Sequence, residues 1–203
     1  TLPMLPGAAT EAMRIGQRFL DAEVLIGPAA TKARFLALAR HAEIIHFGGH
    51  AIVNPSYPSL SKLLLATAGG QGQGQGAGGG GGGSLSAQEI EQLRLPATKL
   101  VVLAACGTAS GMDFRGEGVL SLSRAWLDAG VPVVLASLWN VDDATSQVLF
   151  DYYYRALQAT GDPVAALRQA QLDMLQSGDP AQSNPSEWAA LAAFGASRGA
   201  GAR

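Results

Sequence analysis

A short run of apolar residues constrains the fold of this chain more than any other stretch of its sequence. The run occupies residues 100–105 and ends at Cys106, the single cysteine among 203 residues. A strand that is apolar at every position is typical of a sheet buried on both faces, and such sheets are mostly parallel, with helices on either side. The sequence therefore predicts an α/β fold in which Cys106 lies where a central strand ends.

A second apolar stretch brings a histidine to a matching place. Residues 43–47 predict a strand, and two glycines separate this strand from His50. Ligands of parallel sheets bind at the carboxyl ends of the strands. If both strands run the same way in one sheet, His50 and Cys106 emerge at the same edge. A thiol beside an imidazole is the basis of nucleophilic catalysis.

The rest of the chain alternates between predicted strands and helices. Strands are expected at residues 23–26, 133–136 and 188–194, an extended segment at 60–66, and helices at 10–21, 31–39, 86–93, 118–129, 145–158 and 163–174. Ser86 and Glu89 have the spacing of a capping box, and Asp162 followed by Pro163 is a typical helix start. The strands at 23–26 and 43–47, with the helix between them, predict a right-handed parallel unit.

Residues 69–83 differ sharply in composition, since glutamine alternates with glycine before a run of glycines. No Lys-Ser or Lys-Thr pair follows, so the segment lacks the pattern of a phosphate-binding loop. We expect a flexible loop inside one domain that spans residues 1–203.

Composition excludes several classes of protein. With 48% hydrophobic and 15% charged residues the chain is globular, and a net charge of −2 without a basic cluster argues against a nucleic-acid surface. No apolar run has the length of a membrane span, and no signal peptide is visible. A single cysteine cannot form an internal disulfide, so we expect a cytoplasmic protein. Because the chain does not begin with Met, we expect a fragment of a longer protein.

Four motifs, in order, resemble those of the CHAT domain, a caspase-like cysteine peptidase domain often found behind tetratricopeptide repeats in bacterial proteins. They are His46-Phe-Gly-Gly-His50-Ala51, Leu103-Ala-Ala-Cys106-Gly-Thr108, Gly116-Glu-Gly-Val119 and Ser137-Leu-Trp-Asn-Val-Asp-Asp143. The resemblance extends from about Leu5 to Gly195. It implies a caspase-like, mostly parallel sheet flanked by helices, whose first central strand is missing from this chain.

The resemblance also implies a catalytic dyad of His50 and Cys106. Their separation of 56 residues is close to the roughly 50 residues of the caspase signature. The imidazole would take the thiol proton or protonate the leaving amine. Two backbone N–H groups, those of Cys106 and Ala51, would form the oxyanion hole. Caspase-like enzymes usually have Gly where Ala51 stands.

The last motif is expected to form one wall of the substrate groove. Its residues are Ser137, Leu138, Trp139, Asn140, Asp142 and Asp143. The two aspartates equally suit the start of a helix, where the dipole favours negative charge. In separases of the same clan, a similar Trp-Asp-Val segment helps select a basic residue at P1. Asn140 replaces that Asp here, so a strict basic preference is not implied, although Asp113, Glu117 and the two aspartates are candidate partners for a basic side chain.

The other histidines have structural interpretations. His46 and His50 are four residues apart, about 13 Å along a strand, and no third ligand is near, so metal binding is not expected. We expect His46 to be a hydrogen-bonded core residue and His41 to lie at an exposed helix end.

These features predict a cysteine endopeptidase that cleaves a dedicated protein substrate and needs no cofactor. An upstream tetratricopeptide-repeat region or partner would gate it by placing residues 107–116 and 139–143. The alternative is a catalytically inactive, caspase-like interaction module. Neither interpretation involves nucleic acid or a membrane.

Overall fold

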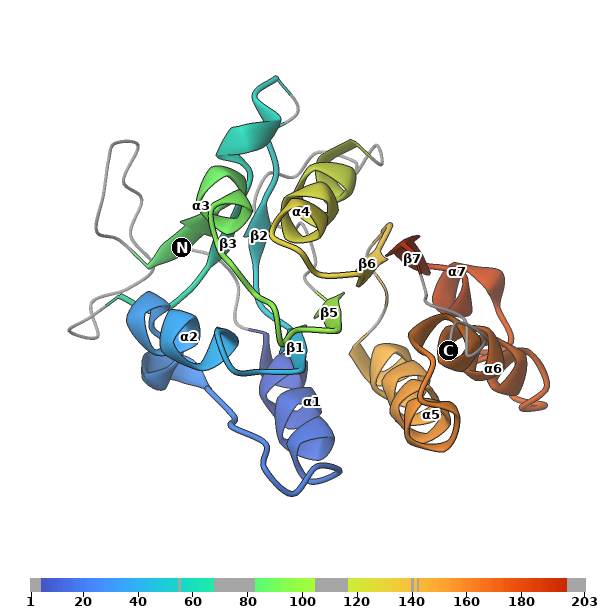
Figure 1. Cartoon of the computed structure of the whole chain (residues 1–203). Helices are drawn as coiled ribbons and strands as arrows, with labels where there is room; N and C mark the ends of the chain where they lie inside the picture. The colour runs from blue at the N-terminus through green and yellow to red at the C-terminus, as the bar shows by residue number, and fades with distance from the viewer. Residues whose placement is uncertain are drawn as a thin grey trace, which may run out of the picture.

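A four-stranded sheet with the order β1-β5-β6-β7 forms the centre of the computed structural model, which describes residues 5–54, 56–67, 83–104, 117–139, 141 and 143–196 (Figure 1). The strands are β1 (Ile44–Phe47), β5 (Leu100–Leu103), β6 (Val133–Ser137) and β7 (Leu191–Gly195). β1, β5 and β6 are parallel, and β7 pairs antiparallel with β6. The predicted α/β class with a mostly parallel sheet is confirmed.

The central strand β5 is buried on both faces, as its apolar sequence predicts. Successive side chains of a strand point to opposite faces. Val101 and Leu103 accordingly join the core on one side of the sheet, and Leu100 and Val102 join the core on the other. Each of the four is at most 4% exposed.

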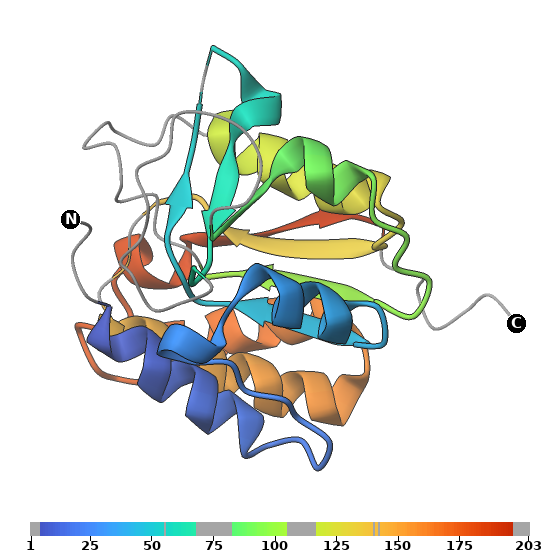
Figure 2. The ribbon, with the colours of Figure 1, turned by 90° about the vertical axis from the view of Figure 1, so that its left-hand side faces the viewer.

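Helices cover both faces of the sheet (Figure 2). One face carries α1 (Pro6–Gly16), α5 (Asp143–Thr160) and α6 (Pro163–Leu175), with the short α7 (Pro185–Trp188) beside α6. The other face carries α2 (Lys32–Ala39), α3 (Ala87–Glu91) and α4 (Glu117–Asp128). Within the described ranges, no helix combines the length and the apolar character that a membrane crossing requires.

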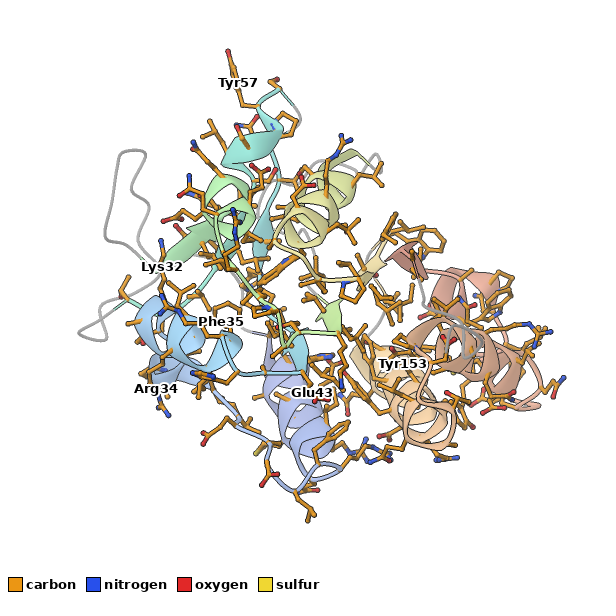
Figure 3. All side chains as sticks on the ribbon, viewed as in Figure 1. Lys32, Arg34, Phe35, Glu43, Tyr57 and Tyr153 are labelled. Carbon is orange, nitrogen blue, oxygen red and sulfur yellow. The ribbon has the colours of Figure 1, made fainter. Side chains whose placement is uncertain are left out.

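A second, small antiparallel sheet with the order β2-β3-β4 follows His50 in the chain. Its strands are β2 (Ala51–Ile52), β3 (Lys62–Leu64) and β4 (Ser84–Ser86), and two 3-10 turns, η1 (Gly27–Ala29) and η2 (Pro58–Leu60), complete the fold. Figure 3 shows Phe35 directed from α2 toward the interior, where it packs edge-on against Trp126 of α4. Tyr57 directly precedes η2 and is 66% exposed; Figure 3 shows it at the top of the molecule.

Two predictions about the first quarter of the chain are wrong. Helix α1 begins at Pro6 rather than after Thr10, because proline fits the first turn of a helix, where its missing N–H is not needed. Residues 23–26 do not form a strand. Val24 instead packs against Gly16 of α1, where an added Cβ would lie 2.5 Å from its Cγ2. The strand-helix-strand unit is therefore not formed, and β1 is the last described strand on its side of the sheet.

The predicted helix starts are confirmed by their hydrogen bonds. Ser86 and Glu89 form a reciprocal capping box at α3. The carboxylate of Asp162 accepts hydrogen bonds from the backbone N–H groups of Val164 and Ala165, at 2.8 and 3.1 Å, and so caps α6. These caps satisfy N–H groups that the first turn of a helix leaves without partners.

The glycine-rich segment 69–83 lies outside the described residues except for Gly83, which has a definite packing role. Its carbonyl accepts the N–H of Leu65 at 2.6 Å. A Cβ added to Gly83 would lie 2.2 Å from the carbonyl oxygen of Leu65. Backbone atoms cannot move aside as a flexible side chain would, so β3 and the segment before β4 would have to separate.

We expect Gly83→Ala to lower the free energy of unfolding by about 2–3 kcal/mol, because it forces two backbone segments apart. Gly161→Ala is the control. Gly161 has a φ of +66° with open space around its Cα, so its replacement should cost only about 1 kcal/mol of left-handed backbone strain. Urea unfolding measures both. Equal losses of unfolding free energy in the two variants would show that the close approach at Gly83 does not contribute to the effect.

Candidate active site

The register of β1 and β5 aligns the ends of the two strands that precede the predicted dyad. Phe47 is the partner of Leu103, and the N–H of Ala104 donates to the carbonyl of Phe47 at 2.9 Å. His50 follows Phe47 by three residues, and Cys106 follows Leu103 by three residues. The predicted parallel arrangement of these strands is confirmed. Cys106 itself lies outside the described residues.

His50 is held between the two sheets. It is 4% exposed, and its carbonyl accepts the N–H of Leu64 in β3 at 2.8 Å. In an antiparallel ladder, hydrogen-bonded pairs alternate with pairs that are not hydrogen-bonded. Because His50 and Leu64 are hydrogen-bonded, the next pair, Ala51 and Leu63, is not. The N–H of Ala51 is therefore directed away from β3, on the open side of the edge strand β2.

The alanine at position 51 fits its backbone without strain. No non-glycine residue in the described part of the chain has a positive φ, and Ala51 belongs to a strand. Its side chain is buried, at 3% exposure. The usual glycine of caspase-like enzymes is thus not required here by backbone conformation.

The two glycines before His50 are needed for space. A Cβ on Gly48 would lie 3.1 Å from Oε1 of Glu11, and a Cβ on Gly49 would lie 2.7 Å from the ring of Phe47. The His-Gly-Gly-His motif therefore lets the chain pass close to α1 and fold back over its own strand.

A buried polar network lies beneath this turn. His46 of β1 contacts Glu11 of α1 through Nε2, at 2.9 Å, and the hydroxyl of Tyr154 of α5 through Nδ1, also at 2.9 Å. The hydroxyl of Ser146 donates to the other carboxylate oxygen of Glu11 at 3.2 Å. The prediction that His46 is a hydrogen-bonded core residue is confirmed. His41 lies exposed just after α2, also as predicted.

The tyrosine hydroxyl of this network keeps its proton. Complete burial, together with the neighbouring Tyr153 and Glu11, raises the pKa of the Tyr154 hydroxyl well above its ordinary value. The hydroxyl of Tyr154 and the carboxylate of Glu11 thus hold the imidazole of His46 through both of its ring nitrogens.

The predicted substrate-binding segment is tied to the elements beside it. The N–H of Leu138 donates to the carbonyl of Ala190 at 2.7 Å, and the indole N–H of Trp139 donates to the carbonyl of Ser186 at 2.6 Å. The Ser137 hydroxyl donates to the carbonyl of Trp139 at 2.6 Å.

Trp139 keeps 40% of its surface exposed. Asn140, Asp142 and Asp113 lie outside the described residues. Asp143 and Glu117 begin α5 and α4, and only their backbones are described.

A pocket opens at the carboxyl edge of the sheet. Its floor includes Gly48 after β1, Ala104 after β5 and Ser137 at the end of β6, so it lies beside the strand ends that lead to His50 and Cys106. Glu11 from α1 and Ser146 from α5 line it as well. The remaining wall is mostly apolar and includes Leu149, Phe150 and Leu191.

Glu11 and Ser146 are not among the site residues predicted from the sequence. A signal for Glu11 exists, because residues three and four apart share a face of a helix. Ala8, Glu11 and Ile15 therefore form one stripe, and a carboxylate in an apolar stripe is unusual. Glu11 is 7% exposed. No comparable pattern distinguishes Ser146.

Comparison with known proteins gives the same assignment as the motifs. The model of one family, the CHAT domain, matches residues 1–196. The chain is 31% identical over 214 residues to tetratricopeptide repeat protein 28 of Homo sapiens, and 29% identical over 213 residues to the protein of the same name of Mus musculus. Each alignment covers 94% of this chain and 8% of the relative. Both relatives are mammalian, and the bacterial origin implied by the resemblance stays a prediction. With its mostly parallel, helix-flanked sheet and matching motifs, the chain belongs to the CHAT domain family.

Proposed function

We propose that this chain is a cysteine endopeptidase with His50 and Cys106 as its catalytic dyad. The observation that carries the proposal is the parallel register of β1 and β5, in which Phe47 and Leu103 are partners. Each proposed catalytic residue follows its strand by the same number of residues. The strands that precede them therefore end at the same carboxyl edge of the sheet, where α/β folds bind ligands.

The proposed reaction uses ordinary thiol chemistry. The Cys106 thiolate attacks the carbonyl carbon of the scissile peptide bond, and the oxyanion accepts hydrogen bonds from the N–H groups of Ala51 and Cys106. His50, which has accepted the proton of the thiol, delivers it to the leaving amine as the C–N bond breaks, and water then hydrolyses the thioester to the acid and the free thiol. The N–H of Ala51 suits this role because the ladder with β3 does not use it.

A protein substrate would lie along the segment that follows β6. Trp139 offers an exposed ring there, and hydrogen bonds to Ala190 and Ser186 hold the segment in place. The pocket at the carboxyl edge would receive one side chain of the substrate. His50 is anchored through both β1 and β3. We therefore expect gating to act on residues 107–116 and 139–143 rather than on the histidine.

An upstream tetratricopeptide-repeat region is the proposed regulator. The relatives are named as tetratricopeptide repeat proteins, and the chain spans 8% of their length. A regulator can shift a conformational equilibrium only through different affinities for the two states. The repeat region would therefore bind the peptidase domain more tightly when the substrate groove is formed.

The test is labelling with a peptidyl acyloxymethyl ketone, a probe that alkylates activated thiolates, followed by mapping of the labelled residue by mass spectrometry. We expect Cys106 to be labelled in the folded protein and labelling to fall sharply in His50→Ala. The probe is applied to this chain and to the full-length protein, because gating predicts faster labelling in the latter. A folded protein whose Cys106 stays unlabelled in both would favour the inactive interaction module.

A further inference from the structure

The pocket at the carboxyl edge contains a buried negative charge. Among the described residues that line it, Glu11 alone has an ionisable side chain. Its carboxylate accepts hydrogen bonds from His46 and Ser146, at 2.9 and 3.2 Å. Hydrogen bonds from β1 and α5 therefore hold the carboxylate in the wall of the pocket.

The arginines on α1 and just after it are engaged elsewhere. Arg18 lies 2.8 Å from the carboxylate of Asp151, and Arg14 lies 3.7 Å from the same group. Both guanidinium groups are thus drawn toward Asp151 of α5. A carboxylate in the wall of a pocket attracts a positively charged group, and more strongly where water is excluded. The pocket is therefore electrostatically suited to a cation.

The walls of the pocket define what kind of cation fits. Leu149, Phe150 and Leu191 present apolar surface, while the carboxylate lies next to Gly48, which leaves room because it has no side chain. A group with an aliphatic stem and a charged end matches this arrangement, since such side chains pack their methylenes on apolar surface. Lysine and arginine side chains have this chemistry.

We propose that this pocket binds the side chain of a lysine or arginine residue of the protein substrate, with Glu11 as the residue that determines the specificity. The site for a cation stands on the pocket alone, whereas its identification as the P1 subsite rests on the proposed peptidase function. The acidic partner of a basic P1 side chain is then Glu11 on α1, rather than Asp142 or Asp143 after β6.

The first experiment measures binding and needs no catalysis. n-Butylguanidinium and n-butylammonium are compared with pentanamide, a neutral molecule of similar size, by ligand-observed NMR with the folded chain. We expect the two cations to bind at least about tenfold more tightly than the amide, and Glu11→Gln to remove this difference, because one charge-assisted contact is lost. Glu23→Gln, at an exposed glutamate, should leave it unchanged. Equal binding of cations and amide to the unaltered chain would overturn the site, whether or not the variant folds.

The second experiment measures cleavage by the full-length protein with peptides that differ only at P1. Lysine and arginine should be preferred over norleucine and glutamine. Glu11→Gln should lower kcat/KM at least about tenfold for the basic peptides while changing that for norleucine little. Cleavage without a preference for basic residues would overturn the P1 assignment and leave the peptidase intact. Cation binding without cleavage of any peptide would support the site and overturn the peptidase.

Discussion

Replacing Cys106 by alanine is expected to lower kcat/KM for peptide cleavage by at least about 10³-fold, and His50→Ala should have nearly the same effect. Alanine has no group that can form the thioester. Without the imidazole, the thiol has a pKa near 8.5, so little thiolate exists at neutral pH, and no acid protonates the leaving amine.

The measurement is cleavage of a fluorogenic peptide by the full-length protein and its variants at equal concentration. Residues that act as a unit are not additive, so the double variant should be no less active than the worse single variant. His41→Ala, at an exposed position, is the control for His50→Ala and should retain full activity. Substantial cleavage by Cys106→Ala would contradict the assignment of the nucleophile.

The central part of the fold follows from local sequence, and its edge does not. β5 and β6 are apolar at nearly every position, and this pattern requires burial on both faces wherever the strands lie. Residues 23–26 have the composition of a strand as well. A strand needs a partner with which to form hydrogen bonds, and composition does not show whether the partner is present. In the structure Val24 packs on Gly16 of α1 instead.

The candidate site is predictable to a similar extent. The position of His50 follows from a strand and two glycines, and the structure adds why each glycine is needed. The pocket, in contrast, combines residues from α1, α5 and three strand ends. Such a combination depends on tertiary packing, and neither Glu11 nor Ser146 belongs to a motif. The local signs of the network are the carboxylate on the apolar stripe of α1 and His46 within an apolar strand.

His46→Ala should have a large effect on stability, lowering the free energy of unfolding by about 3–4 kcal/mol. The imidazole packs edge-on against Phe150, with ring centroids 5.0 Å apart, and its side chain is 9% exposed. Its removal leaves a cavity and takes one of the two hydrogen-bond donors from the buried carboxylate of Glu11. The matched control is again His41→Ala, whose exposed side chain should change stability by less than about 0.5 kcal/mol.

Two further variants separate the contributions of packing and of hydrogen bonding at His46. Tyr154→Phe keeps the ring and removes only the hydroxyl that is hydrogen-bonded to Nδ1 of His46, so it should cost about 1–2 kcal/mol. Glu11→Gln keeps the side-chain volume and removes the charge. Because Glu11 and His46 contact each other directly, the double variant Glu11→Gln with His46→Ala should cost less than the sum of the single variants. Urea unfolding of this chain measures each free energy. Additive losses, or a His46→Ala variant as stable as His41→Ala, would show that the three residues do not act as one network.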